Sequence, residues 1–195
     1  MKRIRNIKIT RIHQLSPNMK RLTFASEDLH DFPENQNGGY IKFLFKKEPS
    51  DKDNSLARPY TIRHFRKHKL ELDIDFSYHP GDNGYATKWA YTAKIGDTIS
   101  ISGPGSKQLI SNDSNWFFFV GDMTALPAIS SYLEELPIDS TGFAVIEITS
   151  ANDKVELKKP KHMNIKWIVK SEENNNVSNF LNAVREIGWL DNKPY

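Results

Sequence analysis

The sequence predicts a six-stranded antiparallel β-barrel over residues 1–108, followed by a parallel-sheet α/β domain over residues 109–195. Three observations support this prediction. Up to about residue 105, short segments alternate apolar with polar residues between clusters of Pro, Asn, Gly and Asp. From Trp116 onward, continuous apolar runs alternate with segments of helical apolar spacing, as in βαβ units. The polar segment 107–115 joins the two patterns.

The alternating segments of the first half predict the barrel strands, because short antiparallel strands separated by turns favour a closed or nearly closed sheet. In order they cover residues 4–12, 20–26, 40–46, 59–65, 69–79 and 97–104. Pro59 opens the fourth segment and cannot donate to a strand ladder, so this segment suits an edge of the sheet. Residues 83–94 break the alternation and predict a short helix.

The second half begins with the run WFFFV at 116–120, which is typical of a parallel strand covered on both faces. A helix is predicted over 125–136, strands over 142–149 and 164–170, and a second helix over 176–189. The chain then stops where a further strand would be expected to begin. We therefore expect either a short protein or a piece of a longer one, in which the last strand and helix of the domain are missing.

Composition excludes several classes of site. The chain has no cysteine, which excludes disulfides, thiolate metal sites and cysteine nucleophiles. The six histidines show no metal-binding spacing, so we expect no resident metal. The start of the chain is basic without a signal-peptide apolar segment, and no apolar run is long enough to cross a bilayer. These features predict a cytoplasmic protein without membrane insertion.

The first 21 residues are basic and contain no acidic side chain. The cations are Lys2, Arg3, Arg5, Lys8, Arg11, Lys20 and Arg21. Such a stretch could contact nucleic acid or an acidic partner. The alternative is a strand pair whose outer face is solvated by basic residues. We favour this alternative and predict no nucleic-acid partner, because no aromatic residues are interleaved for base stacking.

Four short motifs stand in order along the chain: RPYTIR at 58–63, DFSYH at 75–79, GYATKW at 84–89 and GDMTALPAI at 121–129. This ordered set resembles the siderophore-interacting proteins, which are FAD-dependent ferric-siderophore reductases of the ferredoxin-reductase superfamily. Each motif alone is weakly specific, but the resemblance spans nearly the whole chain. It implies that the barrel binds FAD and that the α/β domain resembles an NAD(P)H-binding domain.

The first motif is expected to bind the flavin. The guanidinium of Arg58 is a planar fork suited to a pyrophosphate. Tyr60 lies two positions on, on the same strand face, and offers a ring beside the isoalloxazine. The resemblance directs the hydroxyl of Thr61 at the reactive flavin nitrogen and places the backbone of Ile62 and Arg63 along the ring.

The third motif is expected to face the flavin phosphates. Gly84, Ala86 and Thr87 are small residues at the start of the predicted helix, and a helix N-terminus favours negative charge. The same pattern is also typical of an ordinary capped helix start. By resemblance, these three residues contribute to cofactor binding.

The second motif contributes further residues by resemblance alone. Asp75 and Phe76 are expected near the flavin, and His79 near its phosphate or adenine side. Asp73 and Asp75 share one face of the predicted strand, which raises the alternative of a catalytic carboxylate pair. A solvated face is the favoured interpretation, because no apolar pocket that would raise one pKa is evident.

The fourth motif predicts a strand, a glycine turn and a helix start, the geometry that receives a dinucleotide at the carboxyl edge of a sheet. It lacks the Gly-x-Gly-x-x-Gly pattern of the Rossmann fingerprint. By resemblance, Asp122, Thr124 and Ala125 flank the flavin ring and admit nicotinamide. Met123 stands where relatives usually carry an acidic residue.

Substrate residues are also suggested by the resemblance. Ferric siderophores are often anionic, so lysines near the flavin are expected to attract them. Lys42 and Lys107 are the candidates, although ordinary surface lysines are an equal alternative. Tyr40 stands where relatives commonly have histidine, which suggests a different substrate pocket.

The activity implied by the resemblance is reduction of Fe(III) in a siderophore chelate to Fe(II), with electrons from NAD(P)H or reduced ferredoxin. An electron-carrier protein would then be a partner. No catalytic side chain is expected, because the redox chemistry belongs to the flavin. A general flavin or ferredoxin reductase and a non-catalytic ferric-siderophore-binding protein are alternatives. The sequence does not identify the siderophore, the electron donor or the oligomeric state.

Overall fold

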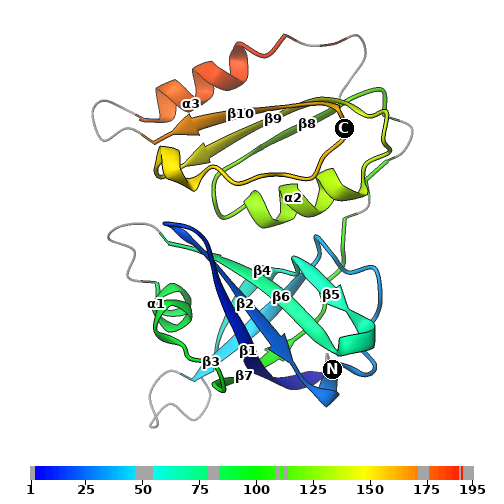
Figure 1. Ribbon diagram of the computed structural model, residues 1–195, viewed down its shortest axis with the longest axis vertical. Coiled ribbons are helices and arrows are strands. Elements are labelled where there is room, and N and C mark those ends of the chain that lie inside the picture. Colours follow the sequence, from blue (N-terminus) through cyan, green and yellow to red (C-terminus); the bar gives the residue numbers. More distant parts are fainter. Residues whose placement is uncertain are drawn as a thin grey trace. The chain divides into compact units, whose positions relative to one another are not determined.

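The structure is a computed structural model that describes residues 3–46, 55–78, 84–108, 110–111, 114–170, 176–188 and 190. The chain divides into two compact units, drawn in Figure 1. The first comprises Met1–Leu15 and Met19–Gln108, and the second comprises Ser16–Asn18 and Leu109–Tyr195.

The first unit is an antiparallel sheet of seven strands in the order β4-β3-β7-β1-β2-β6-β5, which curls into a barrel (Figure 1). The strands are β1 (Ile4–Ser16), β2 (Met19–Ala25), β3 (Tyr40–Lys46), β4 (Ser55–Thr61), β5 (His64–Arg66), β6 (Glu71–Ser77) and β7 (Thr98–Ser102). Short 3-10 turns occupy Glu27–Leu29 and Lys67–Lys69, and helix α1 covers Tyr85–Thr92. The predicted antiparallel barrel is therefore confirmed.

The barrel has one strand more than the six predicted, because the expected strand at 59–65 is two strands. Pairing stops between β4 and β5, where Ile62 N donates to Gly39 O at 2.8 Å and Arg63 N donates to Asp73 O at 2.9 Å. These bonds turn the chain from one part of the sheet to another. Pro59 lies on β4, at the end of the strand order, so the prediction of an edge strand is confirmed.

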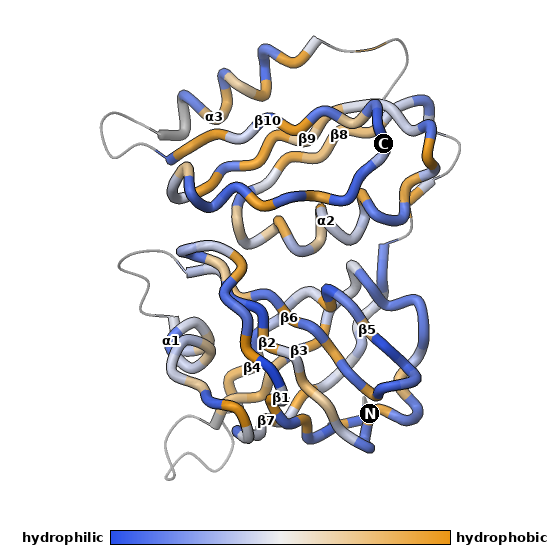
Figure 2. Tube along the Cα trace, viewed as in Figure 1, coloured by the Kyte–Doolittle hydropathy of each residue, from blue (hydrophilic) through white to orange (hydrophobic). Residues whose placement is uncertain are grey.

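Alternating residues of the barrel strands form its core. Ile7, Leu22, Phe43 and Ile74 are at most 1% exposed, and Figure 2 shows barrel strands that switch between hydrophobic and hydrophilic residues. Helix α1 packs Trp89 against this core, with its ring centroid 5.9 Å from that of Phe43. Each large apolar side chain buried in this way contributes roughly 1.5–3 kcal/mol.

The basic first strands pair as predicted, but one of their arginines is buried. Arg5 is 5% exposed, and its Nη2 lies 3.0 Å from the carboxylate of Asp31. Arg11 and Arg21 make ion pairs with carboxylates of β6. The expectation of a solvated basic face is therefore wrong for Arg5, whereas the side chain of Arg11 is 56% exposed although it pairs with Glu71.

The second unit is a three-stranded parallel sheet in the order β10-β9-β8, with α2 on one face and α3 on the other (Figure 1). Its elements are β8 (Phe117–Gly121), α2 (Leu126–Glu135), β9 (Thr141–Ile148), a 3-10 turn (Ala151–Asp153), β10 (His162–Val169) and α3 (Asn176–Arg185). The predicted α/β architecture is confirmed. The expected covering of both faces of residues 116–120 is wrong for Val120, which is 44% exposed on the edge strand of the described sheet.

A fully buried carboxylate organises the segment Ser16–Asn18 within the second unit. Asp153 accepts hydrogen bonds from Ser16 Oγ at 2.7 Å and from both the backbone N and Nδ2 of Asn18 at 2.9 Å. Burial alone would raise the pKa of Asp153, but these hydrogen bonds outweigh it and lower the pKa below its usual value. Asp153 therefore stays charged and holds this turn in place.

Candidate functional site

The RPYT segment lies on edge strand β4, and the strand register separates its side chains onto two faces. Arg58 pairs with Phe43 and Tyr60 pairs with Ile41, both core residues of β3. Directly paired residues of antiparallel strands share a face, so Arg58 and Tyr60 lie on the same side, as predicted. Thr61 has the opposite orientation.

Tyr60 is held by aromatic packing. Its ring centroid lies 4.4 Å from that of Phe76 on β6 and 5.5 Å from that of Phe43. Tyr60 is half-buried, whereas Phe76 is fully buried and supports the tyrosine ring from the core. Arg58 is exposed, and its Nη1 donates to the carbonyl of its neighbour Ala57 at 3.2 Å. The edge thus presents a guanidinium beside a fixed aromatic ring.

The next two residues of the motif are buried, and Ile62 belongs to the barrel core. Ile62 is fully buried and Arg63 is 8% exposed. Both amide hydrogens are engaged within the barrel, by Gly39 O and Asp73 O respectively. Nη1 of Arg63 also lies 2.8 Å from Nε2 of His64. These residues are therefore placed to fix the end of β4.

The two aspartates of β6 do not form a solvated face, so that expectation is wrong. Asp73 and Asp75 are 5% and 7% exposed. Asp75 accepts two hydrogen bonds from Arg21, at 2.6 and 2.8 Å. Asp73 accepts two from Arg66, also at 2.6 and 2.8 Å. Both carboxylates are thus neutralised by arginines that lie far apart from each other in the sequence.

Hydrogen bonding decides the charge of this cluster. Burial would raise the pKa of Asp73, but hydrogen bonds from Arg66, His64 and Thr23 hold it far below its usual value. The hydrogen bond to Asp73 in turn raises the pKa of Arg66. Arg66 also donates to Glu71 at 2.9 Å, which extends the network along β6. The cluster stays ionised at neutral pH and braces the outer face of this strand.

The GYAT segment begins helix α1. Gly84 is the exposed N-cap residue, while Ala86 and Thr87 are buried in the first turn. The first turn contains no acidic side chain that would offset the positive end of the helix dipole. Backbone groups rather than side chains are therefore suited to meet an anion here. His79 lies outside the described residues.

The GDMT turn of the second unit is built around one carboxylate oxygen. Asp122 Oδ1 accepts from Thr124 N at 2.8 Å, from Thr124 Oγ1 at 2.5 Å and from Ala125 N at 3.2 Å. A Cβ added to Gly121 would lie 2.6 Å from the Cβ of Ala125. Glycine is therefore required at position 121 for the close packing of the strand end on Ala125 at the helix start.

Met123 has a structural role that the sequence did not reveal. It is 1% exposed, and its sulfur lies 3.4 Å from Oγ1 and 3.5 Å from the backbone N of Thr149. Thioether sulfur is a weak acceptor, so these contacts attach the turn to the end of β9. From the sequence we inferred only the loss of an acidic group at this position. The contact could not be predicted, because Thr149 lies 26 residues from Met123 in the chain.

Of the two candidate substrate residues, Lys42 lies on the other face of β3 from the partners of Arg58 and Tyr60. Lys42 is exposed opposite Pro59. A Cβ on Gly105 would lie 2.0 Å from Cζ of Tyr40, so only glycine fits beneath this ring. Lys107 lies beside Gly39, the residue before Tyr40. The structure thus brings Lys107 and Tyr40 to one corner of the barrel, and Lys42 follows on the same face of β3.

Neither a metal cluster nor a membrane span is found in the part of the chain that the structure describes. Within these ranges, no group of three or more His, Cys, Asp or Glu residues could hold a metal ion. No described helix is both long and apolar enough to cross a membrane.

Comparison with known proteins identifies the family to which this chain is similar. Residues 8–108 match the siderophore-interacting FAD-binding domain, and residues 114–195 match the siderophore-interacting protein family. Ferric vibriobactin reductase ViuB of Vibrio cholerae is 35% identical over 171 residues, which cover 80% of this chain and 63% of that protein. The NADPH-dependent ferric-chelate reductase of Escherichia coli is 25% identical, covering 88% of this chain and 73% of its own.

Solved structures agree with the sequence relatives. The siderophore-interacting protein SipS from Aeromonas hydrophila has a TM-score of 0.87 at 31% identity, covering all of this chain and 78% of its own. Ferredoxin-NADP+ reductase from Plasmodium falciparum has a TM-score of 0.65 at 18% identity, which shows a shared fold alone. The chain spans 63% of the length of the Vibrio relative.

Proposed function

The chain belongs to the siderophore-interacting protein family, and on that premise we propose that it is an FAD-dependent oxidoreductase that reduces Fe(III) in a siderophore chelate to Fe(II). The observation that carries this proposal is the arginine and tyrosine pair on edge strand β4. Arg58 is exposed, and Tyr60 is fixed by two aromatic neighbours on the same face. This pair provides a cation for phosphate and a flat surface for a flavin, two residues apart on one face of the strand.

The side chains present fit FAD. Arg58 would hold the pyrophosphate together with the backbone at the start of α1, from Gly84 to Thr87. Tyr60 would lie against the isoalloxazine, whereas Thr61, which has the opposite orientation on β4, stays a candidate from the sequence alone. Asp122, Thr124 and Ala125 are our candidates on the second unit, where Asp122 shapes the turn through its hydrogen bonds.

The remaining candidates have supporting roles in this proposal. Phe76 is fully buried and Asp75 is occupied by Arg21, so both would act by fixing neighbouring groups. Ile62 and Arg63 would fix the end of β4 through their backbone hydrogen bonds. His79 stays a candidate from the sequence alone.

Bound FAD supplies two-electron acceptance and one-electron donation, which the protein side chains cannot supply. The chain contributes position and charge. Lys42 and Lys107 would attract an anionic ferric chelate to the barrel. Iron is the substrate in this proposal. Reduction releases it, because siderophores bind Fe(II) less tightly than Fe(III). Oxidation of one NAD(P)H would reduce two Fe(III), and reduced ferredoxin would deliver its electrons singly.

Anaerobic stopped-flow spectroscopy on the FAD-loaded full chain tests this function. We expect NADH, NADPH or reduced ferredoxin to bleach the flavin absorbance, and a ferric siderophore to restore it as a ferrous trap develops colour. The same siderophore loaded with Ga(III), which is not reduced, should leave the flavin bleached. Protein that takes up no FAD would support the non-catalytic binding alternative. Reoxidation by simple electron acceptors but not by ferric siderophores would support a general reductase.

A further inference from the structure

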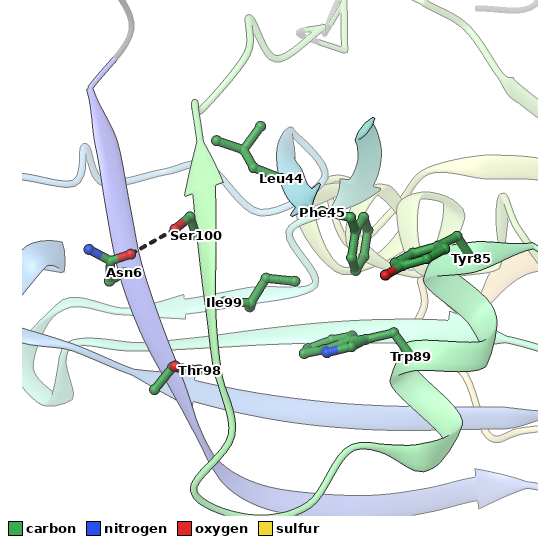
Figure 3. Close-up of a pocket in the computed structure, with 8 residues that line it drawn as sticks. All are labelled: Asn6, Leu44, Phe45, Tyr85, Trp89, Thr98, Ile99 and Ser100. Carbon is green, nitrogen blue, oxygen red and sulfur yellow. Dashed lines mark hydrogen bonds between the residues drawn. The ribbon is translucent and has the colours of Figure 1, made fainter. Parts of the chain in front are cut away.

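A cavity of about 340 Å³ opens in the wall of the barrel, beside the start of α1 (Figure 3). It lies between β3, β7, β1 and helix α1. Its lining residues are Asn6, Leu44, Phe45, Tyr85, Trp89, Thr98, Ile99 and Ser100. This volume lies at the small end of the range for ligand sites in proteins, which runs from about 300 to 1,000 Å³.

The cavity exists because two neighbouring strands separate. The β3–β7 ladder ends where Leu44 pairs with Ser100. Beyond that pair, β3 continues to pair with β4 on its other side and β7 continues to pair with β1. Phe45 and Ile99 therefore face each other across a seam without ladder pairing among the described residues. A strand edge at such a seam offers alternating N–H donors and C=O acceptors.

Aromatic rings form one side of the seam. Tyr85 and Trp89 project from α1 toward Ile99, and Phe45 stands beside them (Figure 3). The Phe45 ring is T-shaped to Tyr85, with centroids 5.3 Å apart, and to Trp89, with centroids 5.8 Å apart. Tyr85 is 50% exposed although it belongs to this cluster. An exposed ring at the mouth of a cavity is suited to stack on a flat ligand.

The polar groups around the cavity are uncharged. No lining residue is acidic or basic. Asn6 Oδ1 accepts a hydrogen bond from Ser100 Oγ at 2.7 Å, and Thr98 adds a hydroxyl. An ionic ligand group would lose hydration here without gaining a counter-charge. A flat heteroaromatic ring fits better, because adenine presents a hydrogen-bond donor and an acceptor side by side on its edge.

We infer that this seam binds an uncharged, flat heteroaromatic ring of the adenine type, stacked on Tyr85 beside Phe45 and Trp89. Two sources of such a ring are consistent with the position. Tyr85 follows the Gly84 cap of α1, so the ring could be the adenine end of FAD, and this source rests on the proposed function. Strand β3 separates the seam from Arg58 on β4, so the ring could instead belong to a separate adenine nucleoside or nucleotide.

Titration of adenosine into the flavin-free full chain, followed by isothermal titration calorimetry, tests the site. We expect saturable binding of one adenosine per chain. Ser100→Tyr should fill the seam and abolish binding, whereas Tyr85→Ala should weaken it roughly tenfold through lost stacking. Ser102→Tyr is the matched control, since it places the same ring on the same face of β7 outside the cavity. Thermal unfolding should be cooperative for all three variants. Absence of adenosine binding, or equal binding by wild type and the Ser100→Tyr variant, would overturn the inference.

Comparison of FAD with FMN identifies the source of the ring. If Ser100→Tyr weakens FAD binding tenfold or more but leaves FMN binding unchanged, the seam holds the adenine of the dinucleotide. If the variant loses adenosine but keeps full affinity for FAD, the seam is a separate nucleoside site. The adenosine titration needs neither flavin nor turnover, so failure of this inference and failure of the proposed reductase activity are distinguishable.

Discussion

Side chains of the RPYT segment alternate between the two faces of β4, so the segment presents different residues on each face. Arg58 and Tyr60 pair with core residues of β3, whereas Thr61 pairs with Tyr40. Lys42 lies on this second face, opposite Pro59. Cofactor retention and attraction of the substrate should therefore depend on different residues of the same short ribbon.

Arg58→Ala tests this division. We expect the variant to lose FAD affinity by about tenfold to a hundredfold, because a charged hydrogen bond to phosphate contributes roughly 1.5–3 kcal/mol. Lys42→Ala removes a cation from the opposite face of the same hairpin and should retain FAD while slowing reoxidation by a ferric siderophore. Flavin absorbance after desalting and fluorescence titration measure the first effect. Equal FAD retention by wild type and Arg58→Ala would contradict the assignment of this arginine.

Strand β6 combines two roles because its two faces differ in chemistry. Leu72, Ile74 and Phe76 enter the core, and the alternate residues carry carboxylates that bind arginines. These arginines come from β1, β2 and the end of β5. The element therefore connects the hydrophobic core to an ionic network that joins four strands.

Asp73→Asn tests the contribution of this network to stability. The folded pKa of Asp73 is below its unfolded value, so its carboxylate stabilises the fold above about pH 4 and loses this effect as pH falls. We expect the variant to lose about 3 kcal/mol of unfolding free energy at pH 7. The difference from wild type should shrink at pH 3.

Urea unfolding at both pH values measures this prediction. Glu186→Gln is the control, because Glu186 pairs with Lys166 at 2.8 Å but the two side chains are 68% and 39% exposed. Exposed ion pairs contribute little, so this variant should change stability far less. A loss for Asp73→Asn that is the same at pH 7 and pH 3 would show that the effect is not electrostatic.

At the scale of the whole molecule, each of the two units carries its own sheet and core. The proposed pyrophosphate contacts lie on β4 and at the start of α1, both in the first unit. A ligand that binds only the folded chain stabilises it by mass action. At equal ligand concentration, the size of that stabilisation reports how tightly each flavin binds.

Thermal unfolding with and without flavin tests this point. FAD at about 100 times its dissociation constant should add about 2.7 kcal/mol. For a chain of this size, each kcal/mol raises the midpoint by about 2–4 °C. Riboflavin lacks the pyrophosphate that Arg58 would hold and should raise the midpoint less at equal concentration. Calorimetric scans of the full chain measure both shifts, and equal shifts for the two ligands would argue against a pyrophosphate site.

The sequence alone predicted the architecture and part of the site, because both depend on local periodicity. Alternation along the barrel strands and helical spacing after Trp116 report which side of each element is buried. The shared face of Arg58 and Tyr60 follows from the same period of two. The missing N–H of Pro59 also predicted, correctly, that its strand lies at an edge of the sheet.

Only the tertiary structure decided where the predicted strand at 59–65 is interrupted and which carboxylates pair with which arginines. The break between β4 and β5 depends on bonds from Ile62 and Arg63 to residues elsewhere in the chain. The burial of Asp73 depends on Arg66, and the seam beside Phe45 depends on where β3 leaves β7. The local sequence shows which side of a single helix or strand is apolar and therefore buried. Cross-strand register and ion pairing are set when segments distant in sequence compete for the same neighbours, and only the folded chain resolves that competition.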